Sequence, residues 1–429
     1  TSAWVDFTGS ITITSSFTDI PHSVNFKSSW YFICGGSDSL YSWDGSGNLT
    51  LVRYYSGKPP AVVIEQSPPT YPKVLCASAE RLFMMNHKDT TDSSSDSVPY
   101  RVSWSDWQQP TRWYAEAPAG SAGYQDLMDE SDPIVAGAVV KYNVYAFKEN
   151  YVYLGTPTNA PRYYIFRNIS SDLGCIAPDS IKQYKDYILF LGSDSNVYMC
   201  SGQDFKNISS TITHRFLDVC DLSNIKYSRA LMDKQNSLYH LFVPKTGSSE
   251  LMHIFTVDLI SGAWTEGEID NTDILPSDTQ EYYTGSLNVV NQIGSKDGYI
   301  YNLTNTAVDD AGDDITTTWT SGMLDVMDLA ESGAYQYRVA SIERASLDRI
   351  LIEADSGVMS LSLTYGDFLN NMTTESLGTL DLTAGSVNYV SPRKVGRFFK
   401  LTITFTDNTD LPEISRIAYV LRQTGEEVR

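Results

Sequence analysis

The segment that decides the fold runs from Arg101 to Gly192 and reads RVSWSDWQQPTRWYAEAPAGSAGYQDLMDESDPIVAGAVVKYNVYAFKENYVYLGTPTNAPRYYIFRNISSDLGCIAPDSIKQYKDYILFLG. Short runs of aromatic and β-branched residues alternate with turn-forming residues, and the apolar positions follow no helical period. Such runs pack well on a pleated, half-buried sheet. The segment therefore predicts strands at Arg101–Trp104, Val139–Phe147, Tyr151–Leu154, Tyr163–Ile169 and Tyr187–Leu191.

The same kind of hairpin recurs on both sides of this segment. An apolar strand is followed by a turn of roughly four residues and by a second strand that carries an aromatic residue. Turn-forming Gly, Ser, Asp and Asn residues supply the tight connections. We expect such hairpins at 31–43, 74–85, 144–155, 187–200, 230–242 and 289–303.

The spacing of these hairpins indicates a repeat of fixed length. Aromatic residues of the second strands are separated by 42, 70, 45, 41 and 62 residues; they are Tyr41, Phe83, Tyr153, Tyr198, Tyr239 and Tyr301. Three of the separations fall near the period of about 40–45 residues expected for a four-stranded propeller blade. The two longer separations, of 70 and 62 residues, contain insertions, which lie at 89–97, 115–132 and 266–281. Residues 1–306 are predicted to form a β-propeller of about six blades, or seven if a degenerate blade lies in the longer gap.

The pattern changes after the last hairpin. Residues 307–314 read AVDDAGDD and are predicted to be an acidic linker. Longer alternating strands then indicate a C-terminal β-sandwich over residues 315–429. Within the repeat we also expect a strand at Ser210–Phe216, and a short helical pattern occurs at Met323–Ala330. The strands expected in the sandwich are Thr316–Trp319, Val339–Glu343, Arg349–Ala354, Met359–Thr364, Ser386–Val390, Arg397–Phe405 and Ile414–Leu421.

Composition narrows the class of function. The formal net charge is −21, which argues against a protein that grips nucleic acid, because phosphate binding draws on clustered Lys and Arg. A negative charge of this size would repel DNA, as the lining of a channel that DNA passes through should. It would equally serve only to keep the protein soluble. Five cysteines without CxxC spacing predict buried free thiols and assembly in a reducing cytoplasm. No apolar run approaches the roughly 18 residues of a membrane span.

Several motifs of the segment Arg101–Gly192 occur in the same order as in a known protein family. A strand ending in Trp104-Ser105 leads to Pro110 and Trp113, and an acidic stretch from Asp129 to Val135 precedes a strand pair. The hairpin from Phe147 to Gly155 and the turn from Gly174 to Pro178 follow. This order resembles that of the β-propeller nozzle and hub proteins of short-tailed bacteriophage tails.

The resemblance implies a structural virion protein, not an enzyme, with no cofactor. It implies a homo-oligomeric ring of six copies in the phage tail, assembled in the host cytoplasm. The ring would retain the genome and then conduct it, so that DNA passes through the lumen without specific binding. The expected partners are a tail adaptor or portal-side protein and tail fibres or a plug. The loops at 89–132 and 266–281 are the expected contacts with them.

Candidate chemistry in the sequence is sparse, and no catalytic, cofactor-binding or metal site is predicted. The acid-rich segments 89–97 and 309–314 lack the ligand spacing of a calcium loop. Five scattered histidines fit core or rim positions: His22, His87, His214, His240 and His253.

Two alternative functions remain open. A carbohydrate-binding propeller of a host-adsorption apparatus would use exposed aromatic residues, for which the candidates are Trp107, Trp113, Tyr114 and Tyr124. A propeller glycosidase is suggested by the sequence from Ser103 to Asp106, which resembles one Asp-box of a sialidase without its central glycine. That box stabilises a turn and supplies no chemistry, so the glycosidase is the weaker alternative.

Overall fold

A computed structural model shows a chain built almost entirely from antiparallel β-strands, which confirms the all-β prediction. Among the described residues the helical elements are α1 (Thr213–Val219) and the 3-10 turns η1 (Pro178–Ser180) and η2 (Ile225–Tyr227). No described helix has the length and apolar character needed to cross a membrane. The described residues are 8–9, 11, 21–34, 39–52, 54–55, 65–66, 71–88, 97–113, 120–128, 132–160, 162–248, 250–269, 276–283, 289–296, 298–303, 309–310, 313–314, 316–326, 344–354, 357–382, 387–406 and 414–423.

The chain divides into two compact units, Thr1–Leu303 and Thr304–Arg429. The acidic segment predicted as a linker contains a short antiparallel ladder between β26 (Asp309–Asp310) and β27 (Asp313–Asp314). The prediction of an acidic linker at 307–314 stays a prediction, with strand pairing at these four residues.

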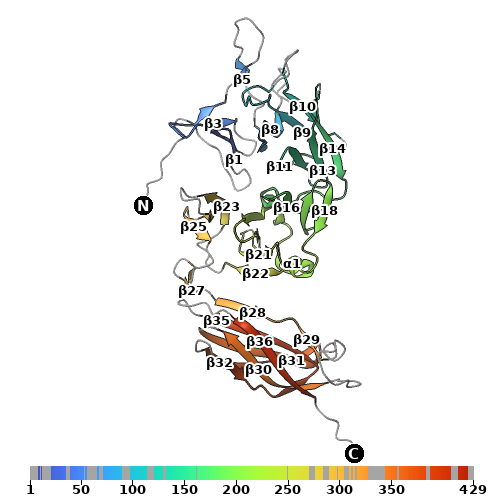
Figure 1. Ribbon diagram of the computed structural model, residues 1–429, viewed down its shortest axis with the longest axis vertical. Coiled ribbons are helices and arrows are strands. Elements are labelled where there is room, and N and C mark those ends of the chain that lie inside the picture. Colours follow the sequence, from blue (N-terminus) through green and yellow to red (C-terminus); the bar gives the residue numbers. More distant parts are fainter. Residues whose placement is uncertain are drawn as a thin grey trace, which may run out of the picture. The chain divides into compact units, whose positions relative to one another are not determined.

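Antiparallel sheets follow one another along the N-terminal unit, each with its strands in sequence order (Figure 1). The described part contains six of them, which we number sheets 1 to 6. A separate short pair joins β5 (Tyr54–Tyr55) to β6 (Glu65–Gln66). Sheet 1 comprises β1 (Pro21–Phe26), β2 (Ser29–Cys34), β3 (Tyr41–Trp43) and β4 (Thr50–Leu51), and sheet 2 comprises β7 (Val74–Ala77), β8 (Leu82–Lys88), β9 (Ser97–Trp104) and β10 (Gly123–Asp126). Sheet 3 comprises β11 (Ala136–Val140), β12 (Asn143–Phe147), β13 (Val152–Pro157) and β14 (Tyr164–Ser170), and sheet 4 comprises β15 (Lys182–Tyr184), β16 (Tyr187–Leu191), β17 (Val197–Ser201) and β18 (Asp204–Asn207). Sheet 5 comprises β19 (Arg229–Asp233), β20 (Leu238–Val243), β21 (His253–Asp258) and β22 (Trp264–Glu268), and sheet 6 comprises β23 (Pro276–Tyr283), β24 (Val289–Ser295) and β25 (Ile300–Leu303).

Neighbouring sheets pack face to face, and this explains the continuous apolar runs in the sequence. In β16, Ile188 and Phe190 pack in a cluster shared with sheet 3. The alternate residues Leu189 and Leu191 pack in a cluster shared with sheet 5. A strand buried on both faces needs apolar residues at successive positions. Further clusters join sheets 1 and 2, sheets 2 and 3, and sheets 5 and 6.

The first strand of each sheet contacts the first strand of the next, from β1 through β7, β11, β15 and β19 to β23. The sheets consequently succeed one another around a common centre (Figure 1).

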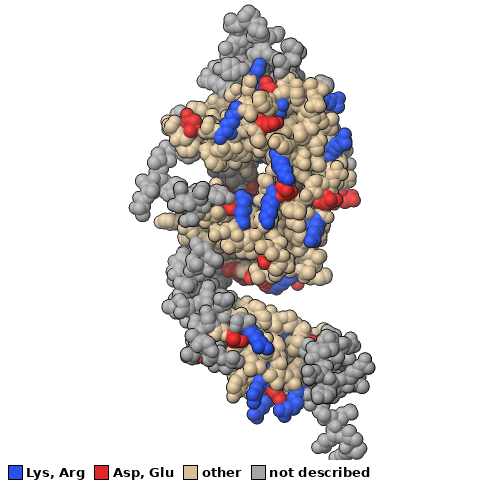
Figure 2. Space-filling view, in the orientation of Figure 1, with Lys and Arg blue, Asp and Glu red and all other residues tan. Residues whose placement is uncertain are grey.

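Lysines at the turn after a first strand link neighbouring sheets. Lys27 donates from Nζ to the carbonyl oxygen of Gln108 at 2.6 Å, which joins sheet 1 to the loop after β9. Lys141 pairs with Asp186 at 2.9 Å between sheets 3 and 4, and Lys234 pairs with Glu281 at 2.6 Å between sheets 5 and 6. Such pairs mix charges of both signs, and Figure 2 shows no single-sign area on the visible face of this unit.

One of these lysines, Lys141, also explains a strand that was predicted too long. The run Val139–Phe147 is two strands, because Lys141 and Tyr142 form a two-residue turn between β11 and β12. Lys141 has φ 58° and Lys185, at the next such turn, has φ 53°. Non-glycine residues rarely adopt this left-handed conformation, so the sequence carries no clear turn signal here.

Three further predictions need correction or fall outside the described residues. The strand expected at Ser210–Phe216 is instead α1, whose Phe216 is buried against sheets 4 and 5. The insertion expected at 266–281 begins within β22 and ends within β23. Half of the helical pattern at Met323–Ala330 lies outside the described residues, and its described half contains a strand, β29 (Leu324–Asp325).

The C-terminal unit consists of two antiparallel sheets that share one hydrophobic core. In the first, the order is β28 (Thr316–Thr320), β35 (Phe398–Thr406), β31 (Gly357–Phe368) and β32 (Asn371–Leu382), with β29 also beside β35. In the second, β30 (Ala345–Ala354) lies between β36 (Ile414–Gln423) on one side and β33 (Val387–Val390) and β34 (Lys394–Gly396) on the other. The long strand β32 was not predicted, because its residues are mostly polar and exposed. The strand expected at Val339–Glu343 lies outside the described residues.

Candidate functional site

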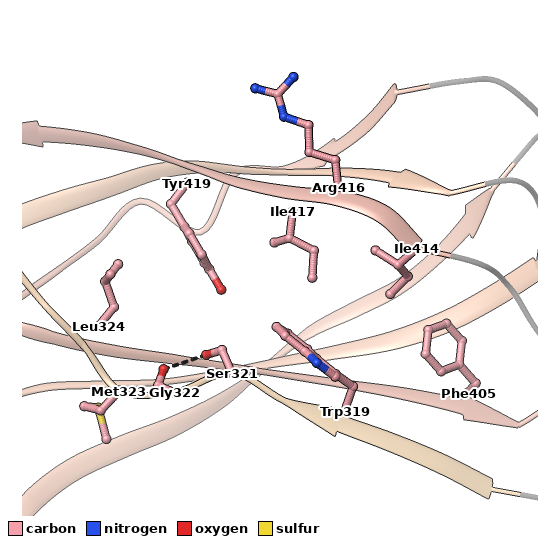
Figure 3. A pocket seen from close by; sticks show the side chains of 10 residues that line it. All are labelled: Trp319, Ser321, Gly322, Met323, Leu324, Phe405, Ile414, Arg416, Ile417 and Tyr419. Carbon is pink, nitrogen blue, oxygen red and sulfur yellow. Dashed lines mark hydrogen bonds between the residues drawn. The ribbon is translucent and has the colours of Figure 1, made fainter. Parts of the chain in front are cut away.

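An open pocket of about 740 Å³ lies between the two sheets of the C-terminal unit (Figure 3). The strands beside it are β28 and β29 from one sheet and β36 from the other, and β28 and β36 each pair with a single described strand. Most of the lining residues are aromatic or aliphatic, but polar and apolar atoms contribute about equally to the accessible wall. The lining residues are Trp319, Ser321, Gly322, Met323, Leu324, Phe405, Ile414, Arg416, Ile417 and Tyr419.

Strand register explains how these side chains come to face a cavity. Trp319 is opposite Ile403 and Tyr419 is opposite Ile350, and both partners are fully buried. Directly paired residues share a face of an antiparallel sheet, so Trp319 and Tyr419 occupy the inner faces of the two sheets. Trp319 is nevertheless 41% exposed. The pocket is therefore an unfilled part of the space between the sheets.

The polar groups at the pocket are few. Ser321 Oγ donates to the carbonyl oxygen of Gly322 at 2.9 Å and accepts from the Leu401 amide at 3.0 Å, which fixes the turn after β28. Burial raises the pKa of Tyr419, although a hydrogen bond with Ser321 lowers it in part. Arg416 is opposite the exposed Glu353, and its side chain points away from the cavity (Figure 3). The lining residues thus combine apolar side chains with accessible polar atoms, and they include no nucleophile paired with a base.

The sequence analysis missed this pocket, although it predicted most of β28 and β36. The available signal was a single tryptophan in the threonine-rich strand Thr316–Thr320. Its exposure depends on how far β36 reaches across the other sheet, which no local pattern reports.

The motif around Trp104 forms a buried joint in sheet 2. Arg81 donates from Nη1 to the carbonyl oxygens of Ser105 at 2.7 Å and Ser121 at 3.0 Å, and from Nη2 to Ser121 Oγ at 2.8 Å. Asp106 Oδ1 accepts from the Ser121 amide at 3.0 Å and from the Ser121 hydroxyl. The indole of Trp104 also donates to the Ser121 carbonyl at 3.2 Å. The Asp-box-like residues therefore fasten the strand to residues 120–122.

The charge state of Asp106 agrees with its role in holding residues 120–122 against sheet 2. Burial alone would raise the pKa of Asp106, but hydrogen bonds from Ser121 and Trp107 and the charge of Arg112 outweigh it, so the pKa is lowered. An ionised carboxylate that accepts several hydrogen bonds is a strong anchor for a turn.

The motif residues Lys148 and Gly174 connect sheets 2, 3 and 4. Lys148 is fully buried and donates from Nζ to the carbonyl oxygen of Leu127, between sheets 2 and 3, at 2.8 Å. Its own carbonyl oxygen accepts from the amide of Cys175, before sheet 4, at 2.9 Å. A Cβ on Gly174 would lie 2.3 Å from the Lys148 carbonyl oxygen and 2.4 Å from that of Glu149. The close approach therefore requires glycine.

The aromatic residues considered for glycan binding divide into three groups. Trp107 and Tyr124 are 55% and 59% exposed, as expected. The prediction for Trp113 is wrong, because it is buried between sheets 1 and 2 and donates from Nε1 to the Pro110 carbonyl at 2.8 Å. Tyr114 lies outside the described residues.

The histidines do not come together. His87 Nε2 is 2.8 Å from Ser103 Oγ, and His240 Nδ1 is 2.8 Å from Thr256 Oγ1. His253 is buried beside Phe255, and its Nε2 lies 4.0 Å from Glu266. His22 is half-buried and His214 is exposed.

The prediction that the cysteines are buried free thiols is confirmed for the four whose side chains are described. Cys76, Cys175, Cys200 and Cys220 are buried free thiols, and burial raises the pKa of each to about 12. The side chain of Cys34 is outside the description. Among the described residues no group of His, Cys, Asp and Glu has the arrangement of a metal site.

Comparison with models of protein families gave no match, and comparison with curated protein sequences gave none. Among solved structures, the extracellular domain of a one-component system from B. thetaiotaomicron matches at 10% identity and a TM-score of 0.36, over 71% of this chain and 36% of that one. The Pan2 WD40 domain of Neurospora crassa matches at 7% identity and a TM-score of 0.37, over 66% and 75%. An exo-β-1,3-galactanase from Phanerochaete chrysosporium matches at 10% identity and a TM-score of 0.29, over 98% and 99%. Similarities this weak support no inference about family or function.

Proposed function

We propose that the protein is a structural component of a bacteriophage tail, a nozzle or hub in which several copies form a ring around the DNA exit channel. One observation carries the proposal. The motif residues that resemble the phage family, among them Trp104, Lys148 and Gly174, are buried at joints within and between sheets. Residues used in this way build a rigid body, which supports a structural role.

We propose further that sheets 1 to 6 are the blades of a six-bladed β-propeller and that the C-terminal unit is a β-sandwich. Support comes from the succession of first-strand contacts and from the hydrophobic clusters between neighbouring sheets. A propeller is a stiff unit with short, protected strand edges. Units of this kind can form a ring through heterologous contacts.

In this proposal six copies form the ring, which assembles in the host cytoplasm and remains in the virion. Its partners are a tail adaptor or portal-side protein on one side and fibres or a plug on the other. DNA passes through the lumen without specific binding, in agreement with the net charge of −21. The protein needs no cofactor and is not an enzyme.

Carbohydrate binding is the second candidate, because two aromatic side chains of sheet 2 and its loops are largely exposed. Tyr124 lies 4.0 Å from the Arg101 guanidinium, and Arg101 pairs with Asp126 at 2.6 Å. An aromatic face beside paired charges can stack on a sugar ring and bind its hydroxyl groups. This surface would then act in host adsorption.

Light scattering behind a sizing column, over a series of protein concentrations, tests the proposal. A mass that rises towards six times 47.8 kDa is the expected result. A monomer at every concentration contradicts a self-assembling ring. A thermal shift with glycans that is lost in Tyr124→Ala and kept in Tyr187→Ala, which changes another exposed tyrosine, would favour carbohydrate binding instead.

A further inference from the structure

His253, the first residue of β21, is a buried histidine without a hydrogen bond from its ring. Its side chain is 5% exposed, and neither Nδ1 nor Nε2 has a hydrogen-bond partner in the part of the chain that the structure describes. The ring lies 4.9 Å from that of Phe255, which packs in turn on Phe216 at 5.1 Å. Buried polar atoms are nearly always paired, and one ring nitrogen of His87 and of His240 has such a partner. The unpaired imidazole of His253 therefore calls for an explanation.

The charges around His253 are balanced as long as its ring is neutral. Glu266 and Glu268 lie on β22, with Glu266 4.0 Å from Nε2 and Glu268 directly opposite His253 in the ladder. Each carboxylate already holds a cation. Arg215 of α1 donates from Nε to both oxygens of Glu266, at 3.1 and 2.9 Å. Lys245, in the loop after β20, pairs with Glu268. A proton on His253 adds a third positive charge beside two carboxylates.

The helix α1 packs beside β21 and β22 (Figure 1). Its contacts there are Phe216, which is 1% exposed, and the pair between Arg215 and Glu266. Hydrogen bonds at both of its ends also hold it. The helix has only seven residues, and its N-cap residue, Ile212, has no side-chain oxygen with which to cap it. Helices this short are marginal without tertiary contacts, so the loss of one contact should loosen α1.

We propose that His253 is a proton-operated switch for α1. In weak acid the imidazolium of His253 draws Glu266 away from Arg215, and the helix separates more often from sheet 5. The step moves one proton from solvent to a ring nitrogen and exchanges one ion pair for another. The inference goes beyond the proposed function, because it concerns the N-terminal unit of a single chain.

The direction of the pH effect follows from linkage. Burial lowers the pKa of His253 below its ordinary value, Glu266 and Glu268 oppose part of this, and Arg215 and Lys245 add to it. A histidine that the open helix leaves in water titrates near pH 6.5. The proton therefore binds the open form more strongly than the closed form, and the open population should grow as the pH falls below about 6.5. The growth is at most about tenfold for each unit of pH, and it stops below the pKa of the closed form.

Cys220 reports the opening directly. It is the C-cap residue of α1, it is 3% exposed, and its amide donates to the carbonyl oxygen of Phe216 at 3.0 Å. The intact protein is labelled between pH 7.5 and pH 5.5 with 4,4′-dithiodipyridine, which also reacts with thiols in acid. Peptide mass spectrometry assigns the label, and each rate is divided by that of a model thiol at the same pH. The expected result is a rise of about three- to tenfold at Cys220 and no rise at Cys76, which is buried between sheets 2 and 3.

Matched histidine variants test whether the proton acts at His253. His253→Phe keeps a flat ring beside Phe255 and takes up no proton, so the rate at Cys220 should stay constant over this pH range. His240→Phe is the control, because burial also lowers the pKa of His240, whose Nδ1 lies 2.8 Å from Thr256 Oγ1. This variant should keep the full rise.

A matched pair of carboxylate variants tests the tie to α1. Glu266→Gln removes the charge that Arg215 binds, so Cys220 should be labelled at pH 7.5 about as fast as in the wild type at pH 5.5. Glu250→Gln is the control, because Glu250 pairs at the surface with Lys296 at 2.6 Å. It should leave the rate at Cys220 unchanged.

Every outcome supports or overturns the switch. A rate at Cys220 that does not depend on pH, or that still rises in His253→Phe, overturns it. Loss of the rise in His240→Phe as well overturns it, because the effect is then not specific to His253. An equal rise at Cys76 shows unfolding of the whole unit and also overturns it. If thermal unfolding shows that His253→Phe does not fold, Glu266→Gln decides, and a wild-type rate in that variant at pH 7.5 overturns the switch.

Discussion

Gly174→Ala should destabilise the N-terminal unit strongly, because the new methyl group meets backbone and not a movable side chain. The Cβ would lie 2.3 Å from the carbonyl oxygen of Lys148, 2.4 Å from that of Glu149 and 2.5 Å from the Glu149 carbonyl carbon. Sheets 3 and 4 would have to separate locally, which also breaks the hydrogen bond from the Cys175 amide to Lys148. Overpacking of this kind costs about 3 kcal/mol.

Differential scanning calorimetry measures this effect. For a unit of this size, a loss of 3 kcal/mol lowers the melting temperature by about 6 °C. Gly267→Ala is the matched control, since a Cβ there meets nothing within 4 Å and φ is not in the left-handed region. We expect the control to change the free energy of unfolding by less than about 0.5 kcal/mol. Equal melting temperatures for the two variants would refute the reasoning that Gly174 is a backbone joint.

Three further predictions concern the same unit. Arg81→Met should cost about 2–3 kcal/mol in urea unfolding, because it removes hydrogen bonds from a charged donor to the buried oxygens of Ser105 and Ser121. Arg215→Met, which removes an exposed pair with Glu266, should cost less than about 1 kcal/mol, and similar losses would contradict the joint. Burial lowers the pKa of His240 and of His253, so the unfolded chain takes up protons more readily below about pH 6.5 and stability should fall on acidification from there. His253→Phe should reduce this slope in unfolding measurements across pH, and an unchanged slope would speak against the buried neutral histidine. In a Cys34→Ser variant the native protein should resist thiol reagents at pH 8, since burial raises the pKa of each remaining thiol to about 12, and labelling without unfolding would show that these thiols are accessible.

The strands of the N-terminal unit were largely predictable, because a sheet buried on both faces requires continuous apolar runs such as Tyr187–Leu191. Their connections were harder to predict. Lys141 and Lys185 adopt a left-handed conformation that is usual for glycine or asparagine, and the turn of Lys141 and Tyr142 contains no typical turn residue. The residues 213–219 form a helix because tertiary packing around Phe216 overrides a weak local preference.

The candidate site was beyond prediction for a related reason. Long polar strands such as β32 carry little apolar pattern, so the edges of the sheets could not be assigned from sequence. The pocket depends on those edges, since Trp319 would be ordinary core if the opposite sheet extended over it.

Electron microscopy of the purified protein at high concentration tests the central claim most directly. The account predicts closed rings with an axial opening and six copies around it. Isolated two-unit particles at every concentration, or open filaments without closure, would contradict a self-assembling ring around a DNA channel.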